Sequence, residues 1–586
     1  MIRALAPWAL AAVGALTLAL TFGVEFPSTN QNTYLVHGLV LHDPSLLTRD
    51  WYVREATDYH HAFSRLVALL FALQDGPGLF IALDWVLVVA SALAWFLLTR
   101  RLLGATVGAL AWASWLGLGA LTRTGDVMVS YLFGGYLQPS SFGIAGYLWA
   151  LALFGEASVA RSDRSRLMLL AASGAARAVG GLFPVNVLLR GMVTLGLAHL
   201  AAHRGRAFSR AFGQGVLVQM ALPMLVLLST APLLLEAARG PTAEALPLLF
   251  EVRAPHHFRP TFASLAPFLA WQAAAWWVVV AHRKSRHAVP PVLVQLLAGV
   301  GGFVLAASFL SLVLRVPQAT QLFPWRFAPV ADGLALLVWL GAALSTALGT
   351  AMPSTEQRRA PLEVPAEPVR AARARLLALV GGAVLAIFGA GGAAAGAERG
   401  RAYLIALTLA VLVGALGAAR LRRRERTAQV ALSLRVPILL VVLGGGGVAM
   451  HEVPLEVQTT SKEKRALLRW ARKHTPKDRL FAVPPDLESF RLEARRAIVV
   501  DWKSAGMLPR DLVTWAARLT DLCGAAPRDL ASARQGYASM DRTRARLLVE
   551  RYGVDLFVFD KKLGSAPSWA PPVHESVRYV VLPAPP

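Results

Sequence analysis

The chain has 586 residues, of which 55% are hydrophobic and 16% are charged, and its mean hydropathy is +0.50. These values exclude an ordinary soluble globular protein and indicate a polytopic α-helical membrane protein. The formal net charge of +24 comes from short basic clusters between apolar stretches, a pattern that orients membrane helices, so the lipid bilayer is the expected partner and nucleic acid is not. A single cysteine, Cys523, excludes a disulfide framework within the chain and a cysteine-rich metal site.

The N-terminal segment MIRALAPWALAAVGALTLALTFGVEF has one arginine followed by roughly 20 apolar residues. It is longer than the core of a signal peptide and has no clear small-x-small cleavage site, which predicts an uncleaved membrane helix over residues 5–24. Arg177 and Arg190 lie inside predicted spans and require protein or water around them. About thirteen spans are expected in all, the others near 78–98, 104–121, 138–155, 167–184, 186–200, 213–233, 264–281, 290–314, 328–351, 376–396, 402–419 and 431–450.

Basic loops between these spans predict the orientation of the transmembrane domain, residues 1–450. With the N-terminus in the cytoplasm, the loops TRRLLG, ARSDRSR, AHRGRAFSR, HRKSRH and RLRRRERTAQ all lie inside, together with a proline-rich cytoplasmic linker at 352–375. An odd number of spans then places the C-terminal region outside. Because the composition rich in Ala, Arg and Gly suggests a double-membrane bacterium, we expect a multi-pass protein of the bacterial inner membrane with a periplasmic C-terminal domain.

The first outside loop, residues 25–77, concentrates acidic and imidazole side chains. Its apolar run AFSRLVALLFAL is too short to span and predicts an interfacial or re-entrant helix. Asp50 and Asp58 are candidate catalytic carboxylates that activate a hydroxyl as general base. For Asp50 the alternative is a helix N-cap in front of WYVREA.

Two His-His pairs are expected on the same outside face. His60 and His61 lie in the first loop, while His256 and His257 lie in the second long loop, 234–263, within EVRAPHHFRP. Carboxylate and imidazole ligands suit a divalent metal such as Mn or Mg, or Zn where imidazole dominates. The alternative is that both pairs are exposed or capping residues.

Arginine and tryptophan at the outer surface predict a site for a lipid-linked phosphate. Arg326 and Trp325 in FPWRF, and Arg259 in PHHFRP, are the candidates, because guanidinium binds phosphate bidentately and indole sits at headgroup depth. The alternative for Arg326 is an aromatic belt with a snorkelling arginine.

Residues 451–586 change in character and predict an exported α/β domain. An amphipathic segment, KEKRALLRWARKH, is followed by the apolar runs LFAVP, AIVVD, DLFVFD and RYVVLP, which are separated by helical stretches. A region of this length can bury a core of its own. In FRLEARRAIVVDWKS, Arg491 and Asp501 flank one strand, and they form either a ligand site or a salt-bridge network that docks the domain on the membrane part.

The layout resembles the GT-C superfamily of integral membrane glycosyltransferases. The likeness lies in an N-terminus inside, a large first outside loop with acidic residues and surface helices, about a dozen spans and an exported C-terminal α/β domain. It implies transfer of a sugar from a polyprenyl-phosphate carrier, with an acidic residue of the first outside loop and, in some members, a metal.

The chain departs from that family directly after the first helix. Many members have an acidic pair where this chain has STNQNTY, and the amides of Asn30, Gln31 and Asn32 do not titrate. Any catalytic acid must therefore be Glu25 or a carboxylate further along the loop. The segments NQNTYLVHGLVLHDPSLLTRDW, APHHFRP and FRLEARRAIVVDWKS also resemble bacterial multi-span proteins of the DUF6798 kind, for which the family name implies no activity.

We therefore expect a glycosyltransferase that moves a sugar from a polyprenyl-phosphate carrier to an envelope acceptor on the outer face of the inner membrane. One alternative is a transporter or flippase for a lipid or envelope precursor, with polar residues such as Arg177 and Asp332 along its path. Another is a non-catalytic membrane scaffold whose exported domain binds an envelope partner.

Overall fold

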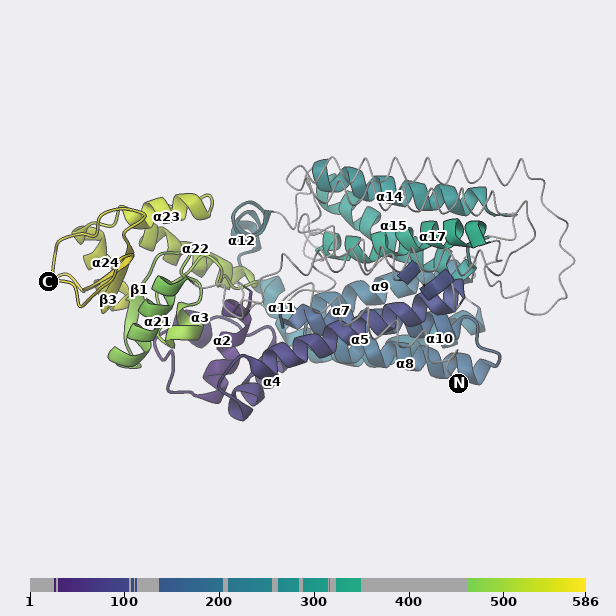
Figure 1. The fold of residues 1–586 in the computed structure, drawn as a ribbon, viewed down its shortest axis with the longest axis horizontal. Coiled ribbons are helices and arrows are strands. Elements are labelled where there is room, and N and C mark those ends of the chain that lie inside the picture. Colours follow the sequence, from purple (N-terminus) through teal and green to yellow (C-terminus); the bar gives the residue numbers. More distant parts are fainter. Residues whose placement is uncertain are drawn as a thin grey trace, which may run out of the picture.

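The structure is a computed structural model and describes residues 26–27, 30–104, 107–109, 111–112, 136–203, 209–255, 262–283, 288–314, 316, 323–348 and 461–586. The described part is elongated, with a bundle of long helices at one end and the C-terminal domain at the other (Figure 1). The helices of the first outside loop lie beside the C-terminal domain, so segments at opposite ends of the sequence meet there.

The bundle contains a helix at each of eight predicted spans. These helices are α5 (Gly78–Leu103), α7 (Pro139–Ala157), α8 (Asp163–Gly181), α9 (Val185–Ala202), α10 (Arg210–Ser229), α14 (Phe262–Ala281), α15 (Pro291–Leu312) and α17 (Ala328–Leu348). Five described segments are long and apolar enough to cross a membrane, namely Gly78–Leu103, Val185–Ala202, Arg210–Ser229, Pro291–Leu312 and Pro324–Ser345. The chain is an integral membrane protein, as predicted. The remaining predicted spans and the linker at 352–375 lie wholly or largely outside the described residues, so the count of thirteen stays a prediction.

The two arginines inside predicted spans are buried and held by backbone carbonyls. Arg177 of α8 donates to the carbonyls of Gly191 and Gln219, both at 2.9 Å. Arg190 of α9 donates to the carbonyl of Phe323 at 3.2 Å. Both guanidinium groups therefore face protein, which is the condition under which a charge is tolerated at membrane depth.

The first outside loop folds into three helices. They are α2 (Gln31–His42), α3 (Trp51–Arg54) and α4 (His61–Leu73), and α4 covers the apolar run predicted to be an interfacial helix. Helix α2 packs on α4 at Gly38, where an added Cβ would lie only 2.4 Å from Val67 Cβ. This glycine therefore sets the close approach of the two helices.

The second long loop contributes α11 (Ala231–Arg239), α12 (Thr242–Pro247) and a single π-helical turn, η1 (Leu248–Arg253). It reaches the C-terminal domain through Arg253, which donates to the carbonyl of Lys503 at 2.8 Å. Both long loops that were predicted to lie outside therefore meet the C-terminal domain.

The C-terminal domain is a mixed sheet with helices packed around it. Its strands β1 (Leu480–Ala482), β2 (Ala497–Ile498), β3 (Leu556–Asp560) and β5 (Tyr579–Pro583) lie at the four apolar runs of the sequence, and β4 (His574–Glu575) joins them in the order β2-β1-β3-β5-β4. Strand β1 pairs parallel with β2 and β3, whereas β5 pairs antiparallel with β3 and β4. The helical elements are α21 (Lys462–His474), η4 (Phe490–Ala494), α22 (Pro509–Cys523), α23 (Leu530–Ala538) and α24 (Arg542–Tyr552).

Local sequence explains the bounds of these helices. The hydroxyl of Ser461 caps α21 by accepting from the backbone N–H of Lys464 at 3.2 Å. Helix α22 ends at Cys523 and is capped by Gly524, whose φ of 82° is left-handed and favours glycine.

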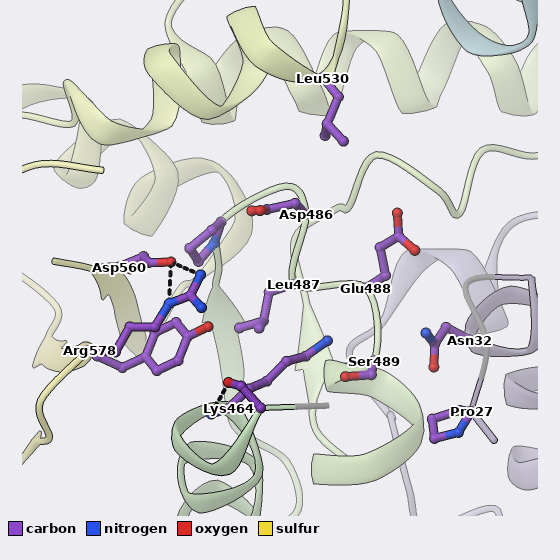
Figure 2. Close-up of a pocket in the computed structure, with 13 residues that line it drawn as sticks. Pro27, Asn32, Lys464, Asp486, Leu487, Glu488, Ser489, Leu530, Asp560 and Arg578 are labelled. Carbon is purple, nitrogen blue, oxygen red and sulfur yellow. Dashed lines mark hydrogen bonds and ion pairs between the residues drawn. The ribbon is translucent and has the colours of Figure 1, made fainter. Parts of the chain in front are cut away.

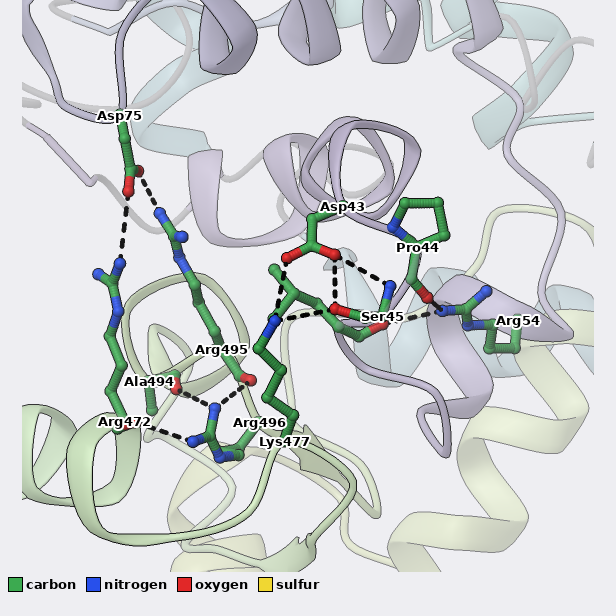
Figure 3. A network of polar contacts seen from close by, with 11 residues as sticks. Asp43, Pro44, Ser45, Arg54, Asp75, Arg472, Lys477, Ala494, Arg495 and Arg496 are labelled. Atoms are coloured by element: carbon green, nitrogen blue, oxygen red, sulfur yellow. Dashed lines mark hydrogen bonds and ion pairs between the residues drawn. The ribbon is translucent and has the colours of Figure 1, made fainter.

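Exposed ion pairs connect the first outside loop to the C-terminal domain (Figure 3). Lys477 lies 3.4 Å from Asp43, and both Arg472 and Arg495 bind the carboxylate of Asp75. Solvent-exposed pairs of this kind contribute little each.

Apolar burial joins the same two parts more strongly. Trp51 and Phe63 of the first loop lie in one hydrophobic core with Val499 and Trp515 of the C-terminal domain, and all four are at most 1% exposed. The loop and the domain therefore share a core and form one packed unit.

Candidate functional site

Asp50 is fully buried at the junction between the first loop and the C-terminal domain. Its carboxylate accepts from the backbone N–H of Tyr52 at 3.0 Å, which makes it the N-cap of α3. It also accepts from Arg491 Nε at 2.7 Å and from the N–H of Ile498 at 3.0 Å. Arg491 is shared with Asp501, at 2.5 Å from its Nη1. The structure thus places Asp50 in the capping position that was the alternative to catalysis, and Arg491 and Asp501 in a docking network.

Asp58 has a more open environment than Asp50. One carboxylate oxygen accepts from the backbone N–H of His60 at 3.0 Å, and the other lies 3.5 Å from His61 Nδ1. The Asp58 side chain is 17% exposed and that of His61 is 68% exposed. Within the described residues no lysine or arginine forms an ion pair with Asp58, so this carboxylate retains capacity to accept a further proton or hydrogen bond.

His60 is held in one tautomer by a backbone carbonyl that follows α8. Its Nδ1 lies 2.6 Å from the carbonyl oxygen of Phe183, directly after α8, and an N–H there must donate because a carbonyl only accepts. Burial lowers the pKa of His60 to about 4, and the positive charge of Arg326 adds to this effect. The ring is therefore neutral near pH 7, with its proton on Nδ1 and a lone pair on Nε2.

Two side chains of α2, His37 and Tyr34, lie close to His60 and Tyr52. The Tyr34 and His60 rings lie 5.3 Å apart between centroids, and those of His37 and Tyr52 lie 5.0 Å apart. Burial lowers the pKa of His37. The nearby carboxylates of Asp58 and Asp50 raise it, but their effect is smaller. Sequence reasoning missed His37, although its three-residue spacing from Tyr34 places both on one helix face.

The charge of Arg326 acts on His60 from the membrane part. It lies in the short turn η2 (Pro324–Phe327), and its guanidinium is 5.0 Å from the centroid of the Phe323 ring. Trp325 is only 5% exposed and packs edge-on against Phe268, with 5.5 Å between ring centroids. Trp325 therefore anchors the turn that carries Arg326.

His256, His257 and Arg259 lie outside the described residues. The predicted bridge between the two His-His pairs is therefore not visible. Across the described ranges no group of three or more His, Cys, Asp or Glu side chains is arranged to hold a metal ion. The described donors alone do not form a metal site, and a divalent metal stays a prediction that depends on the second loop.

The structure thus places a partly exposed carboxylate next to an imidazole that is neutral near pH 7, and the charge of a guanidinium from the bundle acts on that imidazole. Asp58 and His60 come from the first loop and Arg326 comes from the turn before α17. A carboxylate can accept a proton from a hydroxyl, and a guanidinium can bind a phosphate.

Part of the C-terminal domain matches a protein family. Residues 462–522 match the model of a domain of unknown function (DUF6798). A comparison with curated proteins gave no match. The likeness to DUF6798 predicted from the sequence is confirmed over these residues.

The fold is similar to solved structures. Archaeal oligosaccharyltransferase AglB from Archaeoglobus fulgidus, in complex with an inhibitory peptide and a dolichol-phosphate, is similar with a TM-score of 0.51 and 11% identity, over 96% of this chain and 70% of that one. ArnT from Cupriavidus metallidurans in the apo state is similar with a TM-score of 0.47 and 17% identity, over 99% of this chain and 98% of that one. AglB is a GT-C glycosyltransferase, so the similarity to it confirms the predicted GT-C resemblance at the level of fold.

Proposed function

We propose that this chain is a glycosyltransferase that moves a sugar from a polyprenyl-phosphate carrier to an envelope acceptor, on the outer face of the bacterial inner membrane. The observation that carries the proposal is the Asp58 carboxylate that accepts from the backbone N–H of His60, whose ring is within reach of the charge of Arg326 from the bundle. The GT-C fold adds support, because AglB of the same fold has been captured with a dolichol-phosphate and a peptide. The proposal does not specify which sugar is transferred or which acceptor receives it.

In the proposed reaction, an acceptor hydroxyl attacks the anomeric carbon of the carrier-linked sugar. A new carbon–oxygen bond forms, the bond from that carbon to the carrier phosphate breaks, and the phosphate leaves with the electron pair. Asp58 accepts the hydroxyl proton as general base. Arg326 stabilises the charge that develops on the phosphate, because a guanidinium binds phosphate oxygens bidentately.

Asp58 is the better candidate for the base, although both Asp50 and Asp58 were predicted from the sequence. Asp50 is 0% exposed and already accepts from two backbone N–H groups and Arg491. We propose that it positions the loop instead. Trp325 packs on Phe268 and holds the turn that carries Arg326, so we propose that it positions Arg326 without binding substrate itself.

The second outside loop completes the proposal. Arg259 would be a further phosphate ligand, and His256 and His257 would join His60 and His61 if a metal such as Mn or Mg is bound. The observation behind this is that Arg253, shortly before them in the sequence, binds the C-terminal domain at Lys503.

The transporter alternative has less support. Arg177 is held by two backbone carbonyls, and Asp332 accepts from Gln272 at 3.4 Å. These residues of the expected polar pathway therefore stabilise contacts within the bundle.

Comparison of envelope glycans in cells tests the proposal. A deletion strain is complemented with the wild-type chain, with Asp58→Asn, or with the control Glu55→Gln, and surface glycans are profiled by mass spectrometry. Glu55 suits the control because its side chain is 68% exposed and lies 4.0 Å from Arg518, a weak surface pair. We expect wild type and the control to restore a glycan that Asp58→Asn does not. Identical glycans in the deletion strain and its parent would refute the proposal.

A further inference from the structure

A second polar site lies between the C-terminal domain and the start of α2 (Figure 2). It is a cavity of about 420 Å³, a volume within the range of small-molecule sites. Its lining residues are Pro27, Asn32, Ser461, Lys464, Pro484, Asp486, Leu487, Glu488, Ser489, Leu530, Asp560, Arg578 and Tyr579. The segment 484–489 follows β1, and Asp560 ends β3, so the cavity lies at the carboxyl ends of parallel strands, where α/β sheets commonly bind ligands.

Four of the charges near the cavity are already paired. Arg578 donates to the Asp560 carboxylate with two nitrogens, at 2.9 and 2.6 Å. Asp486 lies 3.0 Å from Arg534 Nε. These pairs form walls with little net charge.

Lys464 and Glu488 are the uncommitted charges of the cavity. Within the described ranges, neither the ammonium group of Lys464 nor the carboxylate of Glu488 forms a hydrogen bond or an ion pair. Burial lowers the pKa of Lys464 and raises the pKa of Glu488 to about 7. Above the pKa of Glu488 the two charges are of opposite sign and compensate each other, so the cavity then favours a ligand without net charge.

A buried polar atom on the wall also lacks a partner. Asn32 is 5% exposed, and its Oδ1 has no hydrogen-bond partner in the structure described. Ser489 is 1% exposed, and its hydroxyl interacts with the carboxyl of Glu493. A buried polar atom without a partner costs about 1–3 kcal/mol, so such atoms point to a ligand or water that satisfies them. In Figure 2 the side chains of Lys464, Ser489 and Asn32 approach one region of the cavity.

We propose that this cavity binds a neutral saccharide of one or two rings. Hydroxyls of the sugar would accept from Lys464 and donate to Asn32 and Glu488, while Tyr579 offers an aromatic surface to the ring. The site is separate from Asp58 and does not require the transfer reaction. If transfer occurs, the cavity would hold the acceptor glycan.

Direct binding to the full-length chain in lipid nanodiscs tests this site. Calorimetric titration uses N-acetylglucosamine and its β-1,4-linked dimer as neutral probes, and glucuronate and glucosamine as charged probes of similar size. We expect the neutral probes to bind and Lys464→Met to weaken them at least about tenfold, since a hydrogen bond to a charged group contributes about 1.5–3 kcal/mol. Lys473→Met, an exposed lysine on the same helix α21, is the matched control and should bind as wild type does.

Asn32→Ala separates binding from folding. The substitution removes a buried acceptor that has no partner, so thermal stability should hold or rise while affinity falls at least about tenfold. Absence of neutral-sugar binding by the wild-type chain would overturn the proposal, as would affinity unchanged in both variants or a preference for the charged probes. Because binding is measured without turnover, failure here is distinguishable from failure of the transferase proposal.

Discussion

Asp50 and Asp58 lie on one loop, yet their environments give them different capacities. Asp50 is 0% exposed and its oxygens are occupied by Arg491 and backbone N–H groups, whereas Asp58 is 17% exposed and binds the His60 N–H and His61. A buried, fully partnered carboxylate stabilises the fold, and a partly open one remains available to substrate.

Replacing Asp50 by Asn is expected to destabilise the junction of loop and domain by about 3 kcal/mol. The change removes a charge from a buried pair and leaves Arg491 with only Asp501. Denaturation followed by tryptophan fluorescence measures the effect, because Trp51 and Trp515 are buried in the shared core. Asp43→Asn, which removes an exposed pair with Lys477, is the control and should cost less than about 1 kcal/mol. Equal stability of the two variants would contradict the structural role of Asp50.

His60 should make the protein less stable in acid. Its folded pKa is about 4 against an ordinary 6.5, so the unfolded chain binds more protons between these values and stability falls as pH drops from 6.5 to 4. His60→Gln removes up to about 3 kcal/mol of this pH dependence. The free energy of unfolding, measured between pH 4 and 6.5, checks this pH dependence. The variant His61→Gln is the control, because His61 is an exposed neighbour of His60. Identical pH profiles for wild type and His60→Gln would count against the Nδ1-bonded imidazole with a lowered pKa.

At the scale of elements, α2 and α4 hold the candidate site. Helix α4 begins at His61, next to Asp58 and His60, and it packs on α2 at Gly38. The position of the carboxylate therefore depends on how closely these helices approach.

Gly38→Ala should destabilise this pair of helices by about 1–3 kcal/mol, because the new Cβ would meet Val67 Cβ at 2.4 Å and the Ser64 carbonyl at 2.7 Å. It should also lower activity, since α4 begins directly after Asp58 and His60. Gly76→Ala is the matched control, because no atom lies within 4 Å of its added Cβ. Thermal unfolding of both variants measures the difference, and a Gly38→Ala protein as stable as the control would disprove the close packing.

Local patterns in the sequence predicted most elements but not how they pair. The lengths of the apolar segments predicted eight bundle helices and the short helix α4, and short apolar runs predicted four strands of the C-terminal domain. Both predictions succeed because each depends only on neighbouring residues in the sequence. The partner of Asp50 is Arg491, 441 positions away, and no periodicity links them. His37 and Glu488 were missed for the same reason, since their chemistry arises from burial and from neighbours on other segments.

At the scale of the whole molecule, the first loop, the second loop and the C-terminal domain gather at one end of the bundle (Figure 1). This agrees with the charge pattern that placed all three on one side of the membrane. Which side of the membrane that is remains a prediction. Labelling of introduced cysteines tests it, because the chain has only one cysteine of its own. Cys523 is 4% exposed and burial raises its pKa to about 12, so it should not react with maleimides in the folded chain.

Two variants, each with one added cysteine, test the orientation of the chain in the membrane. Lys473→Cys lies on the C-terminal domain and Ser165→Cys at a loop predicted to be cytoplasmic, and both positions are exposed. In cells with a permeabilised outer membrane, an impermeant maleimide should label the first variant at once and the second only after lysis. Labelling in the opposite order would invert the topology.

Release of polyprenyl phosphate tests the central claim most directly, because it requires no knowledge of the sugar. Purified protein in proteoliposomes is supplied with lipid and envelope extracts from its own cells, and free polyprenyl phosphate is quantified by mass spectrometry. The proposed transferase produces it with wild type and with Glu55→Gln, and Asp58→Asn reduces the rate at least about 100-fold, as loss of a general base does. No release above a protein-free control, or equal release by Asp58→Asn, would contradict sugar transfer at this site.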